Sequence, residues 1–141
     1  MRSLLAAPLA ALVLAACGGA ATGSGAGPSP TPSVAPGPGF DLAVTERDPS
    51  ATMRVGQKIE VVLHAYSGMT DWSHVASSDT SILEPTVNPA ATAVRGVTLA
   101  GFKAVAPGQA EITAGAGPRC SPAQACPMYV LQVAIKVTVT A

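Results

Sequence analysis

The chain has 141 residues, and its eight basic and eight acidic side chains give a formal net charge of zero. Because these charges are scattered singly, the sequence excludes both the basic surface that binds nucleic acid and the polybasic patch that holds a protein on anionic lipid. Aromatic residues make up only 4% of the chain, and Ala and Val supply much of its apolar content. This composition favours one domain of thin β-strands over a fold with a large ligand cavity.

The first sixteen residues are typical of an export signal. One basic residue, Arg2, precedes an apolar run of thirteen residues from Leu4 to Ala16. A membrane-spanning helix needs about twenty apolar residues, so this run is too short to be one, and it ends in the small residues that precede a cleavage site. We therefore expect residues 1–16 to be removed as a signal peptide.

The run ends in Leu14-Ala15-Ala16-Cys17-Gly18, which resembles the lipobox of bacterial lipoproteins. The resemblance implies that the Cys17 thiol receives a diacylglyceryl lipid and that Cys17 becomes the first residue of the mature chain. It also implies a location in the cell envelope, extracytoplasmic and anchored to membrane lipid; each buried methylene stabilises such anchoring by about 0.8 kcal/mol. The alternative is an ordinary signal that is cleaved nearby, with a cysteine present by chance.

Residues 17–39 are expected to form a disordered tether. After Cys17 the segment consists of Gly, Ala, Ser, Thr and Pro with a single Val34, and it has no charged or aromatic side chain. It therefore cannot bury enough surface to fold by itself. Its Pro-rich half favours polyproline II geometry and would reach roughly 30 Å at about 3.1 Å per residue. We interpret the segment as a spacer, with a Pro-rich ligand for another protein as the alternative.

From residue 40 to residue 141 the apolar pattern has period two, which predicts strands and no helix. The expected strands cover residues 40–45, Met53 and Val55, then 58–65, 72–76, 81–87, 98–105, 109–114 and 129–140. Pro85 predicts that its strand lies at a sheet edge. Ala106-Pro107-Gly108 fits a type II turn and predicts a hairpin between its neighbours. About seven strands at this spacing predict a single antiparallel β-sandwich.

Four motifs within residues 52–139 resemble those of bacterial Ig-like (Big-type) modules. In chain order they are Val55-Gly56-Gln57, the stretch 76–83 (ASSDTSIL), the stretch 104–114 (AVAPGQAEITA) and Val137-Thr138-Val139. The resemblance implies an Ig-like sandwich over residues 40–141. It further implies a noncatalytic binding or interaction module, whose partner is an envelope or extracellular protein or a glycan.

A second resemblance is to chagasin-like inhibitors of papain-type cysteine peptidases, which are also Ig-like sandwiches and block the peptidase cleft with three loops at one end. It places the corresponding loops at residues 66–72, at 96–101 and around Arg119. The family's Asn-Pro-x-Thr-Gly is missing from the first loop, the glycines of the second have a different spacing, and Cys120 follows Arg119 in place of Pro. This family is the alternative to the Big-type interpretation.

Cys120 and Cys126 enclose five residues, and in an exported domain we expect them to form a disulfide that fixes an irregular loop. Zinc binding is the alternative, but two thiols without a nearby histidine are a poor ligand set. His64 and His74 lie on different predicted elements. Neither a metal nor a cofactor other than the lipid is therefore expected.

The candidate binding surface consists of loops 66–71, 88–97 and 115–128, because loops from one end of a sandwich cluster. No nucleophile with a credible base is evident, so an enzyme is not expected. Trp72 is interpreted either as a buried core aromatic or as an exposed interface anchor. The candidate binding residues are Tyr66, Gly68, Met69, Asp71, Trp72, Arg95, Gly96 and Arg119.

Overall fold

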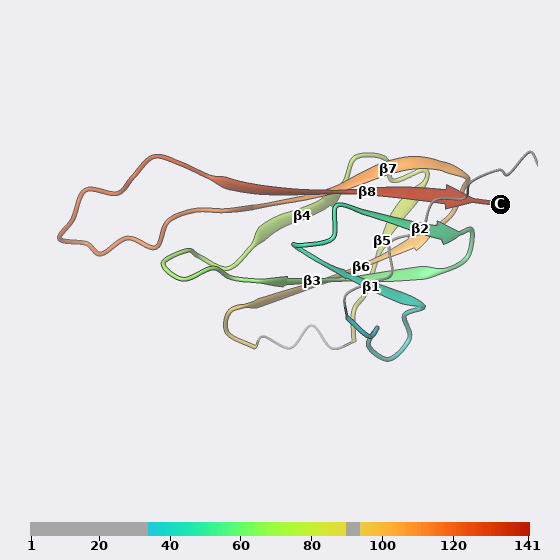
Figure 1. Ribbon diagram of the computed structural model, residues 1–141, viewed down its shortest axis with the longest axis horizontal. Coiled ribbons are helices and arrows are strands. Elements are labelled where there is room, and N and C mark those ends of the chain that lie inside the picture. The colour runs from blue at the N-terminus through green and yellow to red at the C-terminus, as the bar shows by residue number, and fades with distance from the viewer. Residues whose placement is uncertain (1–33, 90–93) are drawn as a thin grey trace, which may run out of the picture.

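Eight β-strands make up the secondary structure of the described part of the chain. The computed structural model describes residues 34–89 and 94–141. The strands are β1 (Leu42–Thr45), β2 (Ser50–Arg54), β3 (Lys58–His64), β4 (Ser73–Ser77), β5 (Leu83–Thr86), β6 (Val97–Ala104), β7 (Gly108–Ala116) and β8 (Leu131–Thr140). They form two packed sheets (Figure 1), which confirms the predicted all-β sandwich. The predicted signal peptide, Cys17 and most of the tether lie outside the described residues.

The two sheets are mixed rather than purely antiparallel. One has the strand order β1-β3-β6-β5 and the other has the order β2-β8-β7-β4. β1 runs parallel to β3 and β2 runs parallel to β8, and the chain passes from one sheet to the other between β1 and β2. The prediction of about seven antiparallel strands is therefore corrected to eight strands with a parallel pair at one edge of each sheet. No helix that could span a membrane is present in either described stretch.

The inner faces of the sheets follow the alternation in the sequence. Ile59, Val61 and Leu63 of β3 are buried as predicted, and Ile135 and Val137 of β8 are fully buried in the facing sheet. Burial of an aliphatic side chain of this size contributes about 1.5–3 kcal/mol relative to exposure. The alternating stretches thus account for the centre of the core.

The two proline-based predictions had different outcomes. Pro85 lies in β5, which is an edge strand as expected. The predicted hairpin around Pro107 is wrong, because β6 pairs with β3 and β5 whereas β7 pairs with β4 and β8. Residues 105–107 instead carry the chain between the sheets, and Gly108 adopts a φ of 149° where β7 begins. A Pro-Gly pair specifies a change of chain direction but not which strands pair afterwards.

Residues 34–41 lie against the outer face of the β1-β3-β6-β5 sheet. The Gly37 amide donates a hydrogen bond of 2.7 Å to the carboxylate of Glu60, and Glu60 is only 4% exposed. The Phe40 ring packs on Gly101, where an added Cβ would come within 2.8 Å of the ring. The folded domain therefore includes residues that the sequence analysis assigns to the tether.

Candidate binding surface at one end of the sandwich

Two loops and the last residues of a third lie at the same end of the molecule, opposite the C-terminus (Figure 1). They are the β3–β4 loop (residues 65–72), the β7–β8 loop (residues 117–130) and residues 94–96 of the β5–β6 loop, which lead into β6. The Ala65 amide donates a hydrogen bond of 2.8 Å to the Gly96 carbonyl, which links the β3–β4 loop to the β5–β6 loop. We call this surface the loop end. It contains the parts of the three loops in which the sequence analysis places the candidate binding residues.

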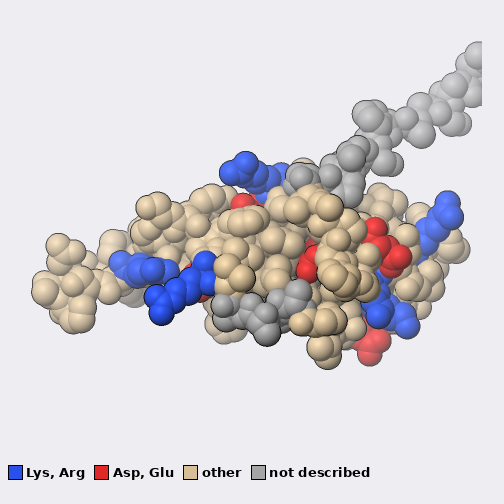
Figure 2. Space-filling model, turned by 90° about the horizontal axis from the view of Figure 1, so that it is seen from below, with Lys and Arg blue, Asp and Glu red and all other residues tan. Residues whose placement is uncertain are grey.

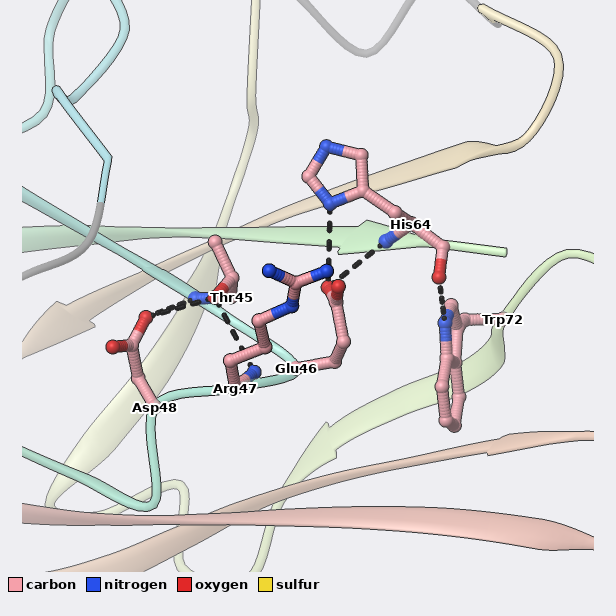
Figure 3. Close-up of polar contacts among 6 residues, drawn as sticks. All are labelled: Thr45, Glu46, Arg47, Asp48, His64 and Trp72. Carbon is pink, nitrogen blue, oxygen red and sulfur yellow. Dashed lines mark hydrogen bonds and ion pairs between the residues drawn. The ribbon is translucent and has the colours of Figure 1, made fainter. Parts of the chain in front are cut away.

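His64, the last residue of β3, is held on both sides where the β3–β4 loop begins (Figure 3). One carboxylate oxygen of Glu46 accepts a hydrogen bond of 3.0 Å from the main-chain amide of His64. The same oxygen lies 3.3 Å from Nδ1 of the His64 ring. The His64 carbonyl accepts a hydrogen bond of 2.9 Å from Trp72 Nε1. Burial raises the pKa of Glu46, but hydrogen bonds from His64 and from the main chain of Glu46 itself, together with attraction to the imidazole, bring that pKa below its usual value. These contacts fix the point at which the loop leaves the sheet.

Trp72 belongs to the core and is only 5% exposed. Its carbonyl accepts a hydrogen bond of 2.9 Å from the Thr98 hydroxyl, and the Tyr66 ring packs edge-on against its indole at a centroid distance of 6.0 Å. Of the two interpretations of Trp72, the structure therefore shows the buried core aromatic. Trp72 is not an exposed anchor, because its ring is enclosed and its N–H is donated to the His64 carbonyl.

The β3–β4 and β7–β8 loops are joined by main-chain hydrogen bonds. The Thr70 amide donates to the Gly117 carbonyl, and the Arg119 amide donates to the Gly68 carbonyl, both at 2.8 Å. Gly68 has a φ of 78°, a conformation that glycine adopts without strain. Met69 lies between these bonds and is 5% exposed, so it packs inside the junction rather than facing solvent. The two loops consequently form one rigid base.

Beyond this junction the β7–β8 loop projects away from the sandwich (Figure 1). Residues 119–130 are all exposed, and we call them the tip. The predicted disulfide between Cys120 and Cys126 is present, with Cα atoms 5.5 Å apart. The covalent ring closes the end of the tip, and the Tyr129 hydroxyl, which donates to the buried Met69 Sδ at 3.6 Å, ties the return of the tip to the core.

Three consecutive apolar residues of the tip face solvent. Met128 is fully exposed, and Tyr129 and Val130 are 50% and 66% exposed. The sequence analysis missed this patch, because the alternation of β8 continues back to Tyr129 and predicts a strand from there, whereas the strand begins at Leu131. Contiguous exposed apolar side chains mark interaction surfaces. A Met-Tyr-Val run next to a cysteine ring is the sequence signal that could have found it.

An open groove of about 650 Å³ lies between the loops of the loop end. Every candidate binding residue except Trp72 lines it, and the lining residues are Ala65, Tyr66, Ser67, Gly68, Met69, Asp71, Arg95, Gly96 and Arg119. Arg119 and Asp71 form an ion pair of 3.7 Å across the groove wall. The groove thus brings together residues that are more than fifty positions apart in the sequence.

The two histidines do not meet in a metal site. His64 contacts Glu46, and the exposed His74 contacts the Ser73 hydroxyl at 3.1 Å. Within the described residues there is no group of three or more His, Cys, Asp or Glu side chains that could hold a metal ion.

Comparison with known proteins gives distant likenesses only. No protein-family model and no curated protein matches the chain. The solved structure of amebosin is 21% identical, with a TM-score of 0.47, over 70% of this chain and 97% of that one. The cysteine protease inhibitor EhICP2 from Entamoeba histolytica is 17% identical, with a TM-score of 0.44, over 74% of this chain and 100% of that one. PbICP-C, solved in complex with falcipain-2, is 16% identical, with a TM-score of 0.38, over 72% and 91% of the two chains. Identities this low do not indicate a shared function.

Proposed function

We propose that this chain is a noncatalytic binding protein whose loop end enters the active-site cleft of a papain-type cysteine peptidase and blocks it. The observation that carries the proposal is the projecting tip, which stands beside the shorter β3–β4 loop and residues 94–96 and is joined at its base to that loop. Loops that are already ordered lose little conformational entropy on binding, so more of the contact energy remains as affinity. A rigid projection of this kind fits a concave partner.

The side chains of the tip suit an apolar cleft. Met128, Tyr129 and Val130 are exposed and adjacent, and the flexible thioether of a methionine adapts to irregular apolar surfaces. Residues 120–130 carry no charge, so burying them in a partner removes no charged group from water. Tyr66, 46% exposed at the neighbouring loop, adds a second aromatic contact of the type enriched at interface hot spots.

The class of partner is proposed from the resemblance of the sequence to chagasin-like inhibitors, which use three loops at one end of the same kind of sandwich. The Entamoeba histolytica protein named above is described as a cysteine protease inhibitor, although the proposal rests on the loops of this chain. A Big-type module that binds a protein or glycan without inhibiting it is the second candidate. The order of its four sequence motifs favours it.

Inhibition assays separate the two candidates. A soluble form of residues 18–141, which retains every strand, is incubated with a papain-type peptidase and a fluorogenic substrate. We expect a dissociation constant below about 1 μM, which corresponds to about 8 kcal/mol of binding free energy.

Met128→Asp should weaken binding at least tenfold, because a charge would be buried without a partner. Val55→Asp is the matched control, since Val55 is exposed on the turn after β2, outside the loop end. Absence of inhibition at high protein concentration would reject the peptidase and favour the second candidate.

We further propose that the mature protein is held at the outside of a membrane by a lipid on Cys17. The lipobox resemblance of residues 14–18 supports this, as does the following segment of small residues and prolines. Such a segment would hold the loop end away from the bilayer, where a soluble peptidase has access to it.

A further inference from the structure

The loop end carries few charged side chains, and they all meet in the groove. Among the described residues of the three loops these are Arg95, Arg119 and Asp71, and each of them lines the groove. Figure 2 shows basic side chains gathered at the base of the projecting tip, while the tip itself is free of charge. The electrostatic character of the surface is therefore concentrated at one place, with an excess of positive charge.

The internal ion pair in the groove is weak. Asp71 lies 3.7 Å from the Arg119 guanidinium, and their side chains are 49% and 67% exposed. An exposed pair of this kind stabilises a fold by about 0–1 kcal/mol. Arg95 takes part in neither of the two ion pairs recorded for the described residues. Both guanidinium groups can therefore engage an outside anion at little cost to the fold, although Arg119 must first leave Asp71.

The main chain nevertheless places both arginines. The Arg119 amide is bonded to the Gly68 carbonyl, and Arg95 precedes Gly96, whose carbonyl accepts the Ala65 amide. A guanidinium binds a carboxylate through two parallel hydrogen bonds, and this geometry makes arginine the preferred partner of carboxylates at interfaces.

We propose that the groove binds an acidic side chain of the protein partner, with its carboxylate between Arg95 and Arg119 and with Asp71 displaced from Arg119. The inference rests on the proposed function for the identity of the partner, and it adds that this partner carries an Asp or Glu at the rim of its cleft. Asp71 competes with that carboxylate for Arg119 in the free protein. It therefore sets the affinity without touching the partner.

Charge variants of the soluble form test the proposal in the peptidase assay. The double variant Arg95→Gln with Arg119→Gln should lower affinity about tenfold, or about 1.4 kcal/mol, and should flatten the loss of affinity between about 0.1 M and 1 M salt. Asp71→Asn should raise affinity several-fold, because it removes the internal competitor. Arg54→Gln is the matched control, since Arg54 is an exposed arginine at the end of β2. Affinity and salt dependence of the double variant equal to those of the control would overturn the proposal.

A second measurement does not depend on the peptidase. A glutamate blocked at its amino and α-carboxyl groups is titrated into the soluble form, and the amide resonances of Arg95, Gly96 and Arg119 are followed by NMR. We expect shifts at these amides that increase in the Asp71→Asn variant and are absent in the double arginine variant. If the peptidase does not bind but these shifts occur, the proposed function fails and carboxylate binding stands. Absence of any shift, or equal shifts in the double variant, contradicts the groove as a carboxylate site.

Discussion

Glu46 shows how a charged side chain is accommodated at the margin of this core. Its side chain is only 4% exposed, yet it faces an imidazole that is more than half exposed and a main-chain amide that points directly at it. A hydrogen bond to a charged group contributes about 1.5–3 kcal/mol, which offsets part of the cost of burial. The same amide belongs to His64, where the β3–β4 loop begins, so the carboxylate also helps to place the loop end.

The pH dependence of stability tests this role. The pKa of Glu46 is lower in the folded protein than its usual value, so the folded state binds that proton less tightly than the unfolded state does. The stabilisation is complete above the usual glutamate pKa of about 4.3 and is lost as the pH falls through the lower folded-state pKa. We expect the unfolding free energy of the wild type to exceed that of Glu46→Gln near neutral pH, and the difference to shrink in acid. Urea denaturation at several pH values measures it, and a difference that does not change with pH would contradict this role.

Trp72 provides the second test at this scale. Because the indole is buried and its N–H is donated to His64, its fluorescence should shift to longer wavelength on unfolding. Trp72→Phe keeps most of the buried volume and loses the hydrogen bond, for an expected cost of about 1 kcal/mol. Trp72→Ala should cost about 3–5 kcal/mol. Emission from the native protein at the wavelength of the unfolded protein would show that the ring is exposed.

At the scale of the elements, the tip depends on its disulfide more than the sandwich does. In the entropy model, a ring of seven residues restricts the unfolded chain by about 2.4 kcal/mol. We expect Cys120→Ser with Cys126→Ser to lower the melting temperature of residues 18–141 modestly and to weaken peptidase binding more strongly, because exposed residues of the tip lose their fixed shape. Hydrogen exchange should quicken more in residues 119–130 than in the β7–β8 ladder, whose amides respond only to the loss of global stability. Two titratable thiols in the unmodified soluble form would contradict the bond itself.

The strands were predictable from the sequence, but their partners were not. Alternation depends only on which face of a strand is buried, so Ile59, Val61 and Leu63 indicate β3 and its inner face without any knowledge of its neighbours. Pairing depends on where the chain goes between strands. The chain reverses direction at Pro107 whether the next strand pairs with β6 or joins the other sheet. The turn connects two sheets because Phe102 packs in one sheet and Ile112 packs in the other.

The candidate site was predictable to a similar degree. Loops 66–71, 88–97 and 115–128 were expected to share one end, since loops of a sandwich gather at its ends, and the groove is lined by residues of all three, Arg95 of the second loop included. Trp72 was ambiguous, because an aromatic at the start of a strand serves equally well inside or outside. The apolar patch after the cysteine ring was missed, because period-two alternation does not stop where hydrogen bonding to the neighbouring strand stops.

In the whole molecule, the proposed binding surface and the residues that lead to the proposed membrane anchor lie in different places. The loop end lies opposite the C-terminus (Figure 1), and residues 34–41 are fixed to the outer face of one sheet through Gly37 and Phe40. Tension on the segment before residue 34 would therefore act first on this sheet face, where neither the tip nor the groove takes part. A tethered form should consequently bind its partner as well as a soluble form does.

The last prediction concerns the proposed lipid anchor at Cys17. Cys17→Ala removes the thiol that would form the thioether, so the full chain produced in a bacterium with a lipoprotein pathway should lose its lipid and should either keep residues 1–16 or be released from the membrane. Fractionation, combined with mass spectrometry of the N-terminus, measures both outcomes. Ser33→Ala is a suitable control, because it changes a small residue of the same segment without removing a thiol. Two or more acyl chains give stable attachment, whereas one gives only marginal attachment, so the wild type should resist extraction by high salt. A Cys17→Ala protein that is cleaved normally and stays with the membrane would show that something other than this lipid holds it there.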